Sequence, residues 1–442
     1  SRGVLFGGNA NNGANAGFAY ANSNNAPSNT NANIGSHLYF SSDDQTLEKR
    51  YMGTTTLPLG KRFRKIRKVS VGTPVVWATE NSDYEKQRQQ AMKRIGNLYE
   101  RIISVENLRL ADEKARRGKL RTYGVRVHDR NREANILALH DALRTKTFRT
   151  SAYDVFTIHE PKERLIFRLP YYPDRIVHHA IMNVLEPIWT SVFTYNTFSC
   201  IKGRGIEGCA RHVDRVIRKY AGRPLYCLKI DIRKFYPSID HAVLKGIVRR
   251  KIKDADLLWL LDEIIDSAEG LPIGNYLSQF LANLTLAYFM HRVNEVLHMD
   301  CAEYADDIVF FSDSKEALHG AFHGFIRPYL ERELHLSVKG NWQVFPIAKN
   351  RYDRHGRALD YVGYRFYREQ KLMRKSIKRN FCRQVARQNR KDPPQSPKKY
   401  KQGIASWLGW AMHSNSRHLL KTIIKKEYYE SCLLYTSDAA DE

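Results

Sequence analysis

The chain lacks the features that mark secreted, membrane-spanning or zinc-binding proteins. Its six cysteines are scattered, none stands in a C-x-x-C pair, and no histidine cluster has the spacing of zinc ligands. The apolar runs are too short to cross a bilayer, and the first residues lack the charged and then apolar pattern of a signal peptide. Scattered cysteines are typical of a reducing compartment. We therefore expect a cytoplasmic protein with no membrane partner.

Acidic residues are scarce relative to basic ones. The 442 residues include 72 Lys and Arg but only 46 Asp and Glu, which gives a net charge of +26. A chain this basic repels itself unless a polyanion neutralises it, so nucleic acid is the natural partner. The charge fits a basic ribosome-associated protein equally well, and it indicates nothing about chemistry.

Both ends of the chain differ in composition from the middle. Residues 1–38 are crowded with Asn, Ala, Gly and Ser and carry almost no charge. Such a segment cannot bury enough apolar surface to offset its ordering entropy, so we expect disorder. Residues 39–90 read as a linker whose basic cluster at 61–68 either contacts phosphate or is simply solvated. Residues 431–442 resemble translated sequencing-adapter DNA, and we exclude them from the fold argument.

Hydrophobic periodicity predicts alternating helices and strands without a clean βαβ repeat, which favours an α+β fold. The predicted helices lie at 82–117, 134–143, 174–189, 242–251, 256–267, 277–296 and 322–334, with basic helices after 368. The predicted extended segments lie at 158–169, 225–232, 301–312 and 360–367.

Two adjacent acids stand out in Tyr304-Ala305-Asp306-Asp307, which an apolar run follows. This pattern predicts a tight hairpin with both carboxylates at its turn. Neighbouring carboxylates repel each other unless cations compensate them, and hard divalent ions such as Mg²⁺ prefer oxygen ligands of this kind. Taken alone, the tetrapeptide fits an ordinary acidic turn at least as well.

A third acid, Asp231, closes the apolar strand predicted at 225–232, and Phe235 and Tyr236 follow it. A two-metal site needs convergent acids, because the two ions lie about 3.5–4 Å apart. An Asp at a strand end commonly caps the next segment instead. Asp231 together with Asp306 is a far more specific signal than either residue alone.

Between these acids lies the segment from Gly270 to Gln279. Gly274 permits close backbone approach, and Ser278 can serve at a helix start beside a nucleotide or a template strand. On its own the segment would read as a plain junction between a loop and a helix.

The order of these three elements resembles that of reverse transcriptases, whose palm domain carries an Asp in one motif and a Tyr-x-Asp-Asp box in a later one. The resemblance covers most of residues 90–430. It implies a right-hand polymerase fold in which 91–224 form the fingers, 225–367 form a palm of antiparallel sheet plus helices, and 368–430 form a helical thumb.

The resemblance also assigns roles to the acids. Asp231, Asp306 and Asp307 match the catalytic carboxylates of the family. Two Mg²⁺ ions, with Mn²⁺ as a substitute, would be held by Asp231, Asp306 and the backbone of Ile232.

Other positions match family contacts with substrate. Lys162 and Arg164 resemble the fingers cations that grip the incoming triphosphate. Tyr236 resembles the aromatic gate that leaves no room for a ribose 2′-OH, and Lys339 resembles a palm lysine that acts as general acid toward pyrophosphate. The full set expected to bind dNTP is Lys162, Arg164, Phe235, Tyr236, Gly274, Ser278, Gln279 and Lys339.

Two further segments match family motifs that contact the nucleic acid. Residues 199–205 resemble a fingers motif near the template. The expected primer grip is the hairpin of Tyr361, Val362, Gly363 and Tyr364.

A departure from the common pattern indicates a branch of the family. Most reverse transcriptases carry Gln before the glycine and Pro after the serine of the third motif, whereas this chain has Ile273 and Gln279 there. That departure resembles the enzymes of diversity-generating retroelements, which copy a template-repeat RNA with errors at adenines. Ile273 cannot make the hydrogen bonds of a glutamine amide, so Ile273 and Gln279 are candidate fidelity residues.

The N-terminal composition fits the same branch. Asn codons are rich in adenine, and residues 1–38 resemble a translated template repeat. The branch implies a bacterial or phage gene, and as partners a template RNA, the cDNA or primer, dNTPs and a small basic accessory variability protein. We find no His-Asn-His nuclease motif and no ribonuclease H segment in the sequence.

Two alternatives remain open. A group II intron or retron reverse transcriptase of ordinary fidelity shares the acids and the gate. A protein of another class, a non-catalytic RNA-binding protein with a polymerase fold, explains the charge. The intact Asp231, Asp306 and Asp307 argue against the second alternative, because like charges this close are costly without a metal.

Overall fold

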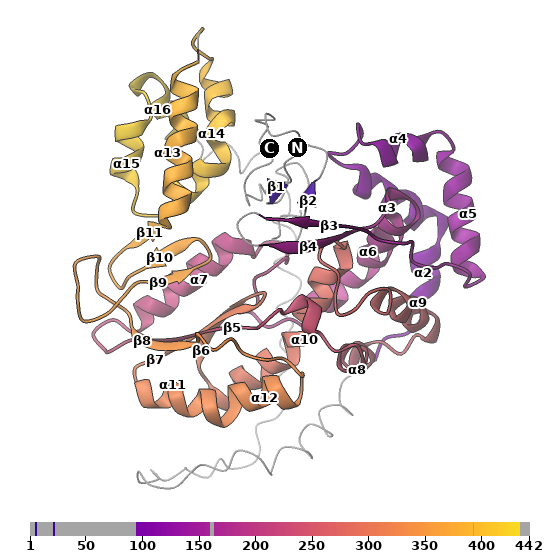
Figure 1. Ribbon diagram of the computed structural model, residues 1–442, viewed down its shortest axis with the longest axis horizontal. Coiled ribbons are helices and arrows are strands. Elements are labelled where there is room, and N and C mark those ends of the chain that lie inside the picture. The colour runs from indigo at the N-terminus through magenta and orange to yellow at the C-terminus, as the bar shows by residue number, and fades with distance from the viewer. Residues whose placement is uncertain (1–4, 7–20, 23–93, 160–162, 392, 434–442) are drawn as a thin grey trace, which may run out of the picture.

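The computed structural model describes residues 5–6, 21–22, 94–159, 163–391 and 393–433 (Figure 1). Nearly all of the Asn-rich segment, the basic linker, Lys162 and residues 434–442 therefore lie outside the described residues. The first described elements are two short strands, β1 (Leu5–Phe6) and β2 (Ala21–Asn22), which pair antiparallel.

A layer of helices follows and lies at the right of Figure 1. It comprises α2 (Tyr99–Ile103), α3 (Val105–Arg116), α4 (Tyr123–Asp129), α5 (Arg132–Arg144) and α6 (Ile176–Thr190), the last preceded by the π-helical turn η2 (Tyr171–Arg175). The predicted helix at 82–117 is, in its described part, two helices, because Ser104 ends α2 and its hydroxyl accepts the Asn107 N–H that opens α3. The sequence analysis did not predict α4, whose seven residues are too short to show a helical period.

A β-hairpin extends from this layer over the middle of the molecule (Figure 1). Its strands are β3 (Asp154–Ile158) and β4 (Arg164–Arg168), with Ile158 opposite Arg164. The backbone N–H of Phe167 donates to the carbonyl of Ile273 at 2.9 Å. This bond ties the hairpin to the segment that precedes the long central helix.

The central sheet has four antiparallel strands in the order β6-β7-β5-β8. They are β5 (Tyr226–Asp231), β6 (Asp300–Tyr304), β7 (Asp307–Ser312) and β8 (Gln343–Pro346). The strands predicted at 225–232 and 301–312 are confirmed, whereas β8 was not predicted. The register places Asp231 of β5 opposite Asp307 of β7.

One face of this sheet belongs to the larger hydrophobic core, to which Leu228, Ile230 and Phe310 contribute fully buried side chains. The helices of that core on this side are α8 (His241–Lys251), α9 (Ala255–Ile265), α10 (Tyr276–Arg292) with the turn η4 (Val293–Leu297), α11 (Lys315–Ala321), the turn η5 (Phe322–Ile326) and α12 (Arg327–Arg332). The helix predicted at 322–334 begins earlier, at Lys315, because the Ser314 side chain caps it.

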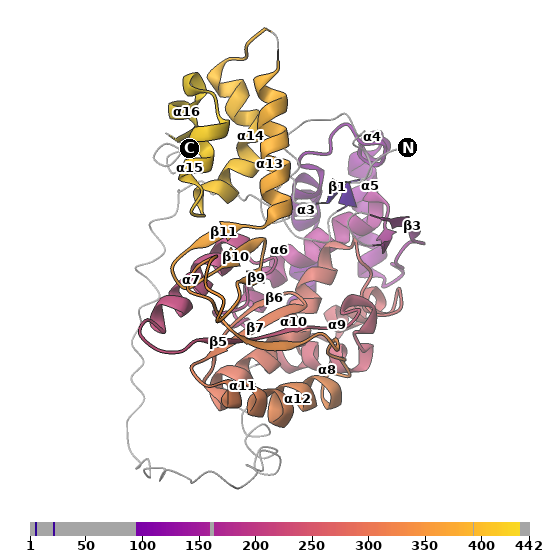
Figure 2. The same cartoon turned by 60° about the vertical axis from the view of Figure 1, so that its left-hand side comes forward.

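The other face, with Cys227 and Phe311, belongs to a second core. That core contains α7 (Gly205–Lys219) and a three-stranded sheet of β9 (Leu359–Tyr361), β10 (Tyr364–Phe366) and β11 (Lys371–Met373). Four helices complete it and rise above the sheet in Figure 2: α13 (Lys375–Asn389), α14 (Pro397–Met412), α15 (Arg417–Ile423) and α16 (Lys426–Leu433).

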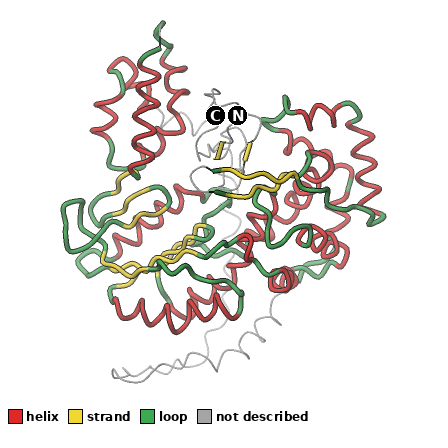
Figure 3. The backbone as a smooth tube through the Cα atoms, viewed as in Figure 1, coloured by secondary structure: helices red, strands yellow, loops and turns green. Residues whose placement is uncertain are grey.

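The α+β prediction is confirmed, and the three parts have the arrangement expected of fingers, palm and thumb (Figure 3). Packing does not follow the predicted boundaries. The helix α7, predicted in the fingers, shares the second core with α13, α14, α15 and α16. The strand β11 pairs with β10 across the predicted boundary at 367, and α16 continues past residue 431 with Cys432 buried. Among the described residues, every helix is too short or too polar to span a bilayer.

Candidate active site

The acidic turn predicted from the sequence is the tip of the β6–β7 hairpin. Tyr304 pairs with Asp307, so only Ala305 and Asp306 form the loop. Ala305 has φ +56°, in the left-handed region that non-glycine residues adopt infrequently. Strained backbone of this kind persists where surrounding structure holds it, and it is concentrated at functional sites.

The strand β5 brings the third acid to the same turn. Asp231 ends β5 directly opposite Asp307, and the N–H of Ile232 donates to the carbonyl of Asp306 at 3.1 Å. The structure therefore brings together the three acids that the sequence analysis singled out, although about 75 residues separate them in the chain.

The carboxylates affect one another electrostatically. Burial raises the pKa of Asp306, and the nearby Asp231 raises it further, while Lys339 and Arg164 oppose the shift. Burial also raises the pKa of Asp307 to about 6, against the lowering effect of Lys229. Added positive charge at this turn would stabilise the ionised form of both acids.

Two lysines hold the acids from the sides. The Lys339 ammonium donates to Asp231 Oδ1 at 2.6 Å, and the Lys339 backbone N–H donates to the Asp231 carbonyl at 2.9 Å. The Lys229 ammonium donates to Asp307 Oδ2 at 3.0 Å. All four side chains are about one-third exposed, so these ion pairs orient the acids and contribute little stability. The sequence analysis missed Lys229, although strand alternation places it on the face of Asp231.

The donor set for a cation is limited. Asp307 Oδ1 is buried and has no hydrogen-bond partner in the described part of the chain, an arrangement that is costly unless a donor or a cation satisfies it. Within the same residues, no three His, Cys, Asp or Glu side chains form a group that could hold an ion. Asp231 and Asp306 are close enough for the charge of Asp231 to raise the pKa of Asp306, and carboxylate oxygens are ligands that hard cations prefer. A metal contact by the Ile232 backbone remains a prediction.

Tyr236 begins a short 3-10 turn, η3 (Tyr236–Ser238), just after β5. Burial raises its pKa, with Asp306 adding to the shift and Arg164 opposing it, so these three side chains are neighbours. The ring of Phe235 is buried in the core and meets the Tyr236 ring edge-on, with centroids 5.6 Å apart. Phe235 therefore supports Tyr236 from below.

The predicted close approach at Gly274 is found, and its partner is β4. Gly274 has φ +127°, and a Cβ there would lie 2.5 Å from the carbonyl oxygen of Phe167. Ile273 is partly exposed, whereas Ser278 and Gln279 are buried in the first turns of α10. Gly274 thus lets the β3–β4 hairpin, and Arg164 with it, dock beside the acids.

The predicted primer-grip residues form the turn between β9 and β10. Val362 and Gly363 both have positive φ, while Tyr361 and Tyr364 are fully buried. The Tyr361 hydroxyl lies within hydrogen-bonding distance of two carbonyl oxygens, at 2.9 Å from Asp307 and 3.0 Å from Ala302. The β9–β10 hairpin therefore packs against the acidic β6–β7 hairpin, and a contact with primer remains a prediction.

A buried acid behind the turn was not predicted. Glu303 of β6 is fully buried, its Oε2 accepts the Thr197 hydroxyl at 2.8 Å, and burial raises its pKa to about 8. Thr197 and its neighbours lead into the segment 199–205, and the Ser199 carbonyl accepts the Asn283 side-chain amide of α10 at 2.6 Å. A Glu in an apolar strand was the sequence signal that could have indicated this contact.

Comparison with known proteins agrees with this geometry. Residues 159–339 match the family model described as reverse transcriptase (RNA-dependent DNA polymerase). That stretch contains β4, η3, the central acids and Lys339, and it stops before the primer-grip hairpin. The match places this part of the chain in the reverse transcriptase superfamily.

Curated relatives cover parts of the same region. Protein YkfC of Escherichia coli is 27% identical over 139 residues, covering 29% of this chain and 36% of that protein. The group II intron-encoded protein LtrA of Lactococcus lactis subsp. cremoris is 26% identical over 129 residues, covering 27% of this chain and 21% of that protein. The chain thus spans about a third of the length of YkfC and about a fifth of the length of LtrA.

Solved structures of yeast telomerase are also similar. A telomerase from Candida tropicalis aligns over 64% of this chain and 57% of that one, at 11% identity and a TM-score of 0.41. A telomerase from Candida albicans in complex with a fragment of telomeric RNA aligns over 66% and 56%, at 10% identity and a TM-score of 0.39.

Proposed function

We propose that the chain is an RNA-directed DNA polymerase. The observation that carries the proposal is the meeting of Asp231 and Asp306 at one end of the central sheet, beside Arg164 and Tyr236. Convergent carboxylates with a cation and an aromatic ring on the flank suit nucleotidyl transfer, which needs charge neutralisation and positioning more than covalent chemistry.

Divalent cations, with Mg²⁺ as the first candidate, fit this donor set. Asp231, Asp306 and the Ile232 carbonyl would hold them, and the orphaned Asp307 Oδ1 and the raised pKa of Asp306 are what a missing positive charge would leave behind. When bound, the ions would lower the pKa of the primer hydroxyl and balance the charge of the triphosphate.

The chain's own residues would orient the nucleotide. Arg164, held on β4 against Gly274, is in place to neutralise triphosphate oxygens. Tyr236, backed by Phe235, would lie beneath the sugar and exclude a 2′-OH. Lys339 is tethered to Asp231 at 2.6 Å and could pass its proton to departing pyrophosphate. Lys162 belongs to the same proposed grip.

The thumb would hold the duplex product. The helices α13 and α14 carry many exposed Lys and Arg side chains, and such cations bind phosphates without regard to sequence. The predicted ranges for fingers, palm and thumb are kept as proposals, together with the template RNA, the primer and dNTPs as partners.

Within this activity we favour the diversity-generating branch, with a template-repeat RNA, adenine-directed errors and a small basic accessory protein. Its support is Ile273, whose side chain is partly exposed beside Gly274 where the common pattern has a glutamine. An intron or retron enzyme of ordinary fidelity is the second candidate, supported by the similarity to the intron-encoded protein LtrA.

The test is dNTP incorporation by the full chain on a primed RNA template with Mg²⁺. Asp306→Ala should abolish incorporation while leaving RNA binding in place. Asp313→Asn is the matched control, because Asp313 follows the far end of β7 and pairs only at the surface, with Arg223. An active Asp306→Ala variant would contradict the proposal. An inactive Asp313→Asn variant would show that the loss of activity reflects misfolding and not the loss of a specific carboxylate.

The branch is tested by sequencing the same products. Errors concentrated opposite template adenines, and reduced by Ile273→Gln, would support the diversity-generating reading. Evenly accurate synthesis that Ile273→Gln leaves unchanged would favour the intron or retron reading.

A further inference from the structure

A basic loop joins the strands β8 and β9 at the end of the central sheet opposite the acids. It comprises residues 349–357, which we call the distal loop, and this part of the chain lies at the left-hand edge of Figure 1. Pro346, which ends β8, pairs with Tyr226 at the start of β5, whereas Asp231 ends β5. Five steps along a strand span about 17 Å, so the distal loop lies well outside the catalytic turn.

The distal loop carries positive charge that no described carboxylate neutralises. Four of its nine residues are cationic and exposed: Lys349, Arg351, Arg354 and Arg357. None of them forms an ion pair with a described residue. Asp353 is the only acid of the loop, and its carboxylate accepts the backbone N–H groups of Lys349 at 2.8 Å and His355 at 2.9 Å. These backbone hydrogen bonds lower the pKa of Asp353, so its negative charge holds the turn while the cations face solvent.

The backbone of the distal loop is held in one shape. The N–H of Ala348 donates to the carbonyl of Arg357 at 3.0 Å, which closes the loop at its base. The Asn350 side-chain oxygen accepts the Tyr352 N–H at 3.0 Å, and the Asn350 amide donates to Glu369, between β10 and β11, at 3.2 Å. Binding to the loop would therefore cost little entropy in ordering its backbone.

An aromatic ring stands among these cations. Tyr352 is 74% exposed, and the Arg351 guanidinium lies over its ring, 4.6 Å from the centroid, and donates to its hydroxyl. An exposed ring beside several cations is the chemistry by which proteins bind single-stranded nucleic acid, because bases stack on rings while phosphates meet cations. An acidic peptide would pair with the same cations but would leave the Tyr352 ring without a stacking partner.

We propose that the distal loop binds a single strand of nucleic acid outside the catalytic cleft. A base would stack on Tyr352, and phosphates would lie against Lys349, Arg351 and Arg354. The favoured source is a stretch of the template RNA that is not being copied, an assignment that rests on the proposed function. Single-stranded cDNA has the same chemistry and is the other source. Such a second contact would keep the RNA near the cleft at a high effective concentration.

The test measures the binding of a second strand while the cleft is already filled. The full chain carrying Asp306→Ala is first bound to one equivalent of a primer–template duplex with a short 5′ template overhang. A short uridine-rich RNA that carries a fluorophore is then titrated, and fluorescence anisotropy gives Kd. Tyr352→Ala should raise this Kd about fivefold or more, the effect of losing one stacked base. Tyr352→Phe keeps the ring and should keep the parent Kd.

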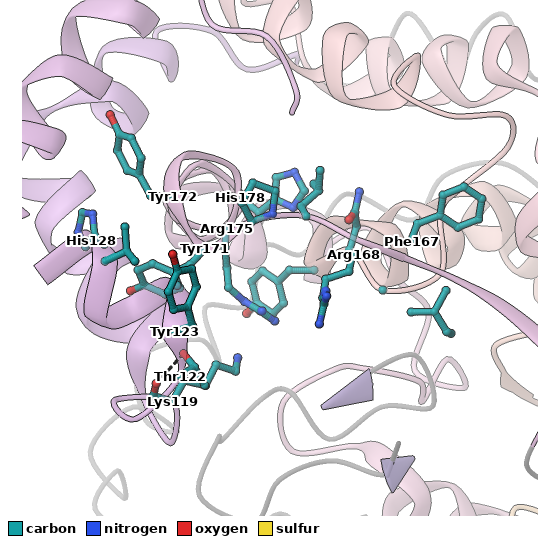
Figure 4. Close-up of a pocket in the computed structure, with 18 of the residues that line it drawn as sticks. Lys119, Thr122, Tyr123, His128, Phe167, Arg168, Tyr171, Tyr172, Arg175 and His178 are labelled. Carbon is teal, nitrogen blue, oxygen red and sulfur yellow. Dashed lines mark hydrogen bonds between the residues drawn. The ribbon is translucent and has the colours of Figure 1, made fainter. Parts of the chain in front are cut away.

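Tyr123→Ala is the matched control for the aromatic change. Tyr123 is 78% exposed, and in Figure 4 it lies on the wall of a cavity of the helical layer, which Arg168 of β4 also lines. Since Tyr123 is not part of the distal loop, Tyr123→Ala should bind the labelled RNA as the parent does. If Tyr352→Ala binds that RNA as tightly as Tyr123→Ala, the distal loop is not a nucleic-acid site.

The dependence of Kd on salt measures the phosphate contacts. Each contact with a single strand contributes about 0.7 to the slope of log Kd against log salt concentration, so Arg354→Ala should reduce that slope by about 0.7. Arg332→Ala is the matched control, because it removes one exposed charge from the end of α12 and should leave the slope unchanged. An equal reduction in both variants would show that net charge alone attracts the RNA, and would contradict the proposal.

Two competitors identify the ligand. If polyglutamate displaces the labelled RNA as effectively as unlabelled RNA of the same charge, the loop recognises charge alone and the proposal is wrong. A DNA strand of the same sequence distinguishes the two sources: RNA that binds at least as tightly supports the template, whereas tighter binding of DNA would overturn that assignment.

Incorporation of dNTP on a short primed RNA template separates this proposal from the proposed function. Tyr352→Ala, in a chain that keeps Asp306, should incorporate dNTP as the parent does, and a loss of incorporation would contradict a site outside the cleft. Strand binding that depends on Tyr352, in a chain whose parent incorporates no dNTP, supports the distal loop and contradicts the polymerase. Incorporation by a chain whose strand binding does not depend on Tyr352 supports the polymerase and contradicts the distal loop.

Discussion

Replacing Gly274 by Ala should disturb the packing of β4 against residue 274 while leaving the acids Asp231, Asp306 and Asp307 in place. Gly274 has φ +127°, and its Cβ position lies 2.5 Å from the Phe167 carbonyl oxygen. An L-residue in that backbone region costs about 1–3 kcal/mol. The clash must also displace β4, which would weaken the Phe167 to Ile273 hydrogen bond, worth about 0.5–1.5 kcal/mol.

Together these terms predict a loss of about 2–4 kcal/mol in the free energy of unfolding, measured by urea titration. Because Arg164 moves with β4, we also expect kcat/KM for dNTP to fall roughly tenfold to a hundredfold, mainly through KM. We expect the acids to remain in place, since the atoms nearest to a Cβ at residue 274 belong to Phe167 and Ile166 of β4.

Gly246→Ala in α8 is the control for the same chemical change. A Cβ at Gly246 meets nothing within 4 Å, and Ala in a helix stabilises by about 0.5–1 kcal/mol relative to Gly. If Gly274→Ala matches Gly246→Ala in both stability and KM, the docking argument is wrong.

Two more predictions follow from raised pKa values. The carboxyl of Glu303 is protonated up to about pH 8 in the folded chain but only to about 4.5 when unfolded, so its contribution to stability is fully present at low pH and is lost as pH rises through that window. The free energy of unfolding of Glu303→Gln should therefore rise relative to that of the parent chain by about 1.4 kcal/mol per pH unit across this window. Urea titrations at several pH values measure the difference, and a difference that does not change with pH would contradict the raised pKa of Glu303. Mg²⁺ should raise Tm more at pH 8 than at pH 5, because protonation of the proposed ligand Asp306 and of its neighbour Asp307, whose pKa is about 6, removes negative charge that attracts the cation. Calorimetry giving equal shifts in Tm at both pH values would contradict this.

Local sequence was sufficient for the elements that carry the acids. The apolar run ending in Asp231 predicted β5, and the run after Asp307 predicted the hairpin, because strand and turn preferences act over a few residues. Short or half-polar elements such as α4 and β8 were missed, since their periods are too brief to detect. The order of the motifs then indicated the family, and residues 159–339 bear this out.

Which residues meet was decided by the tertiary structure. Lys229 binds Asp307, burial raises the pKa of Glu303 behind the turn, and the Tyr361 hydroxyl reaches two carbonyls of the β6–β7 hairpin. Sheet register and burial bring these segments together, and sequence spacing does not relate them. The sequence by itself determined the chemistry available to this chain, since it fixes residue types and local backbone preferences. The distances, charges and exposures that direct that chemistry depend on long-range packing, and only the folded structure determines them.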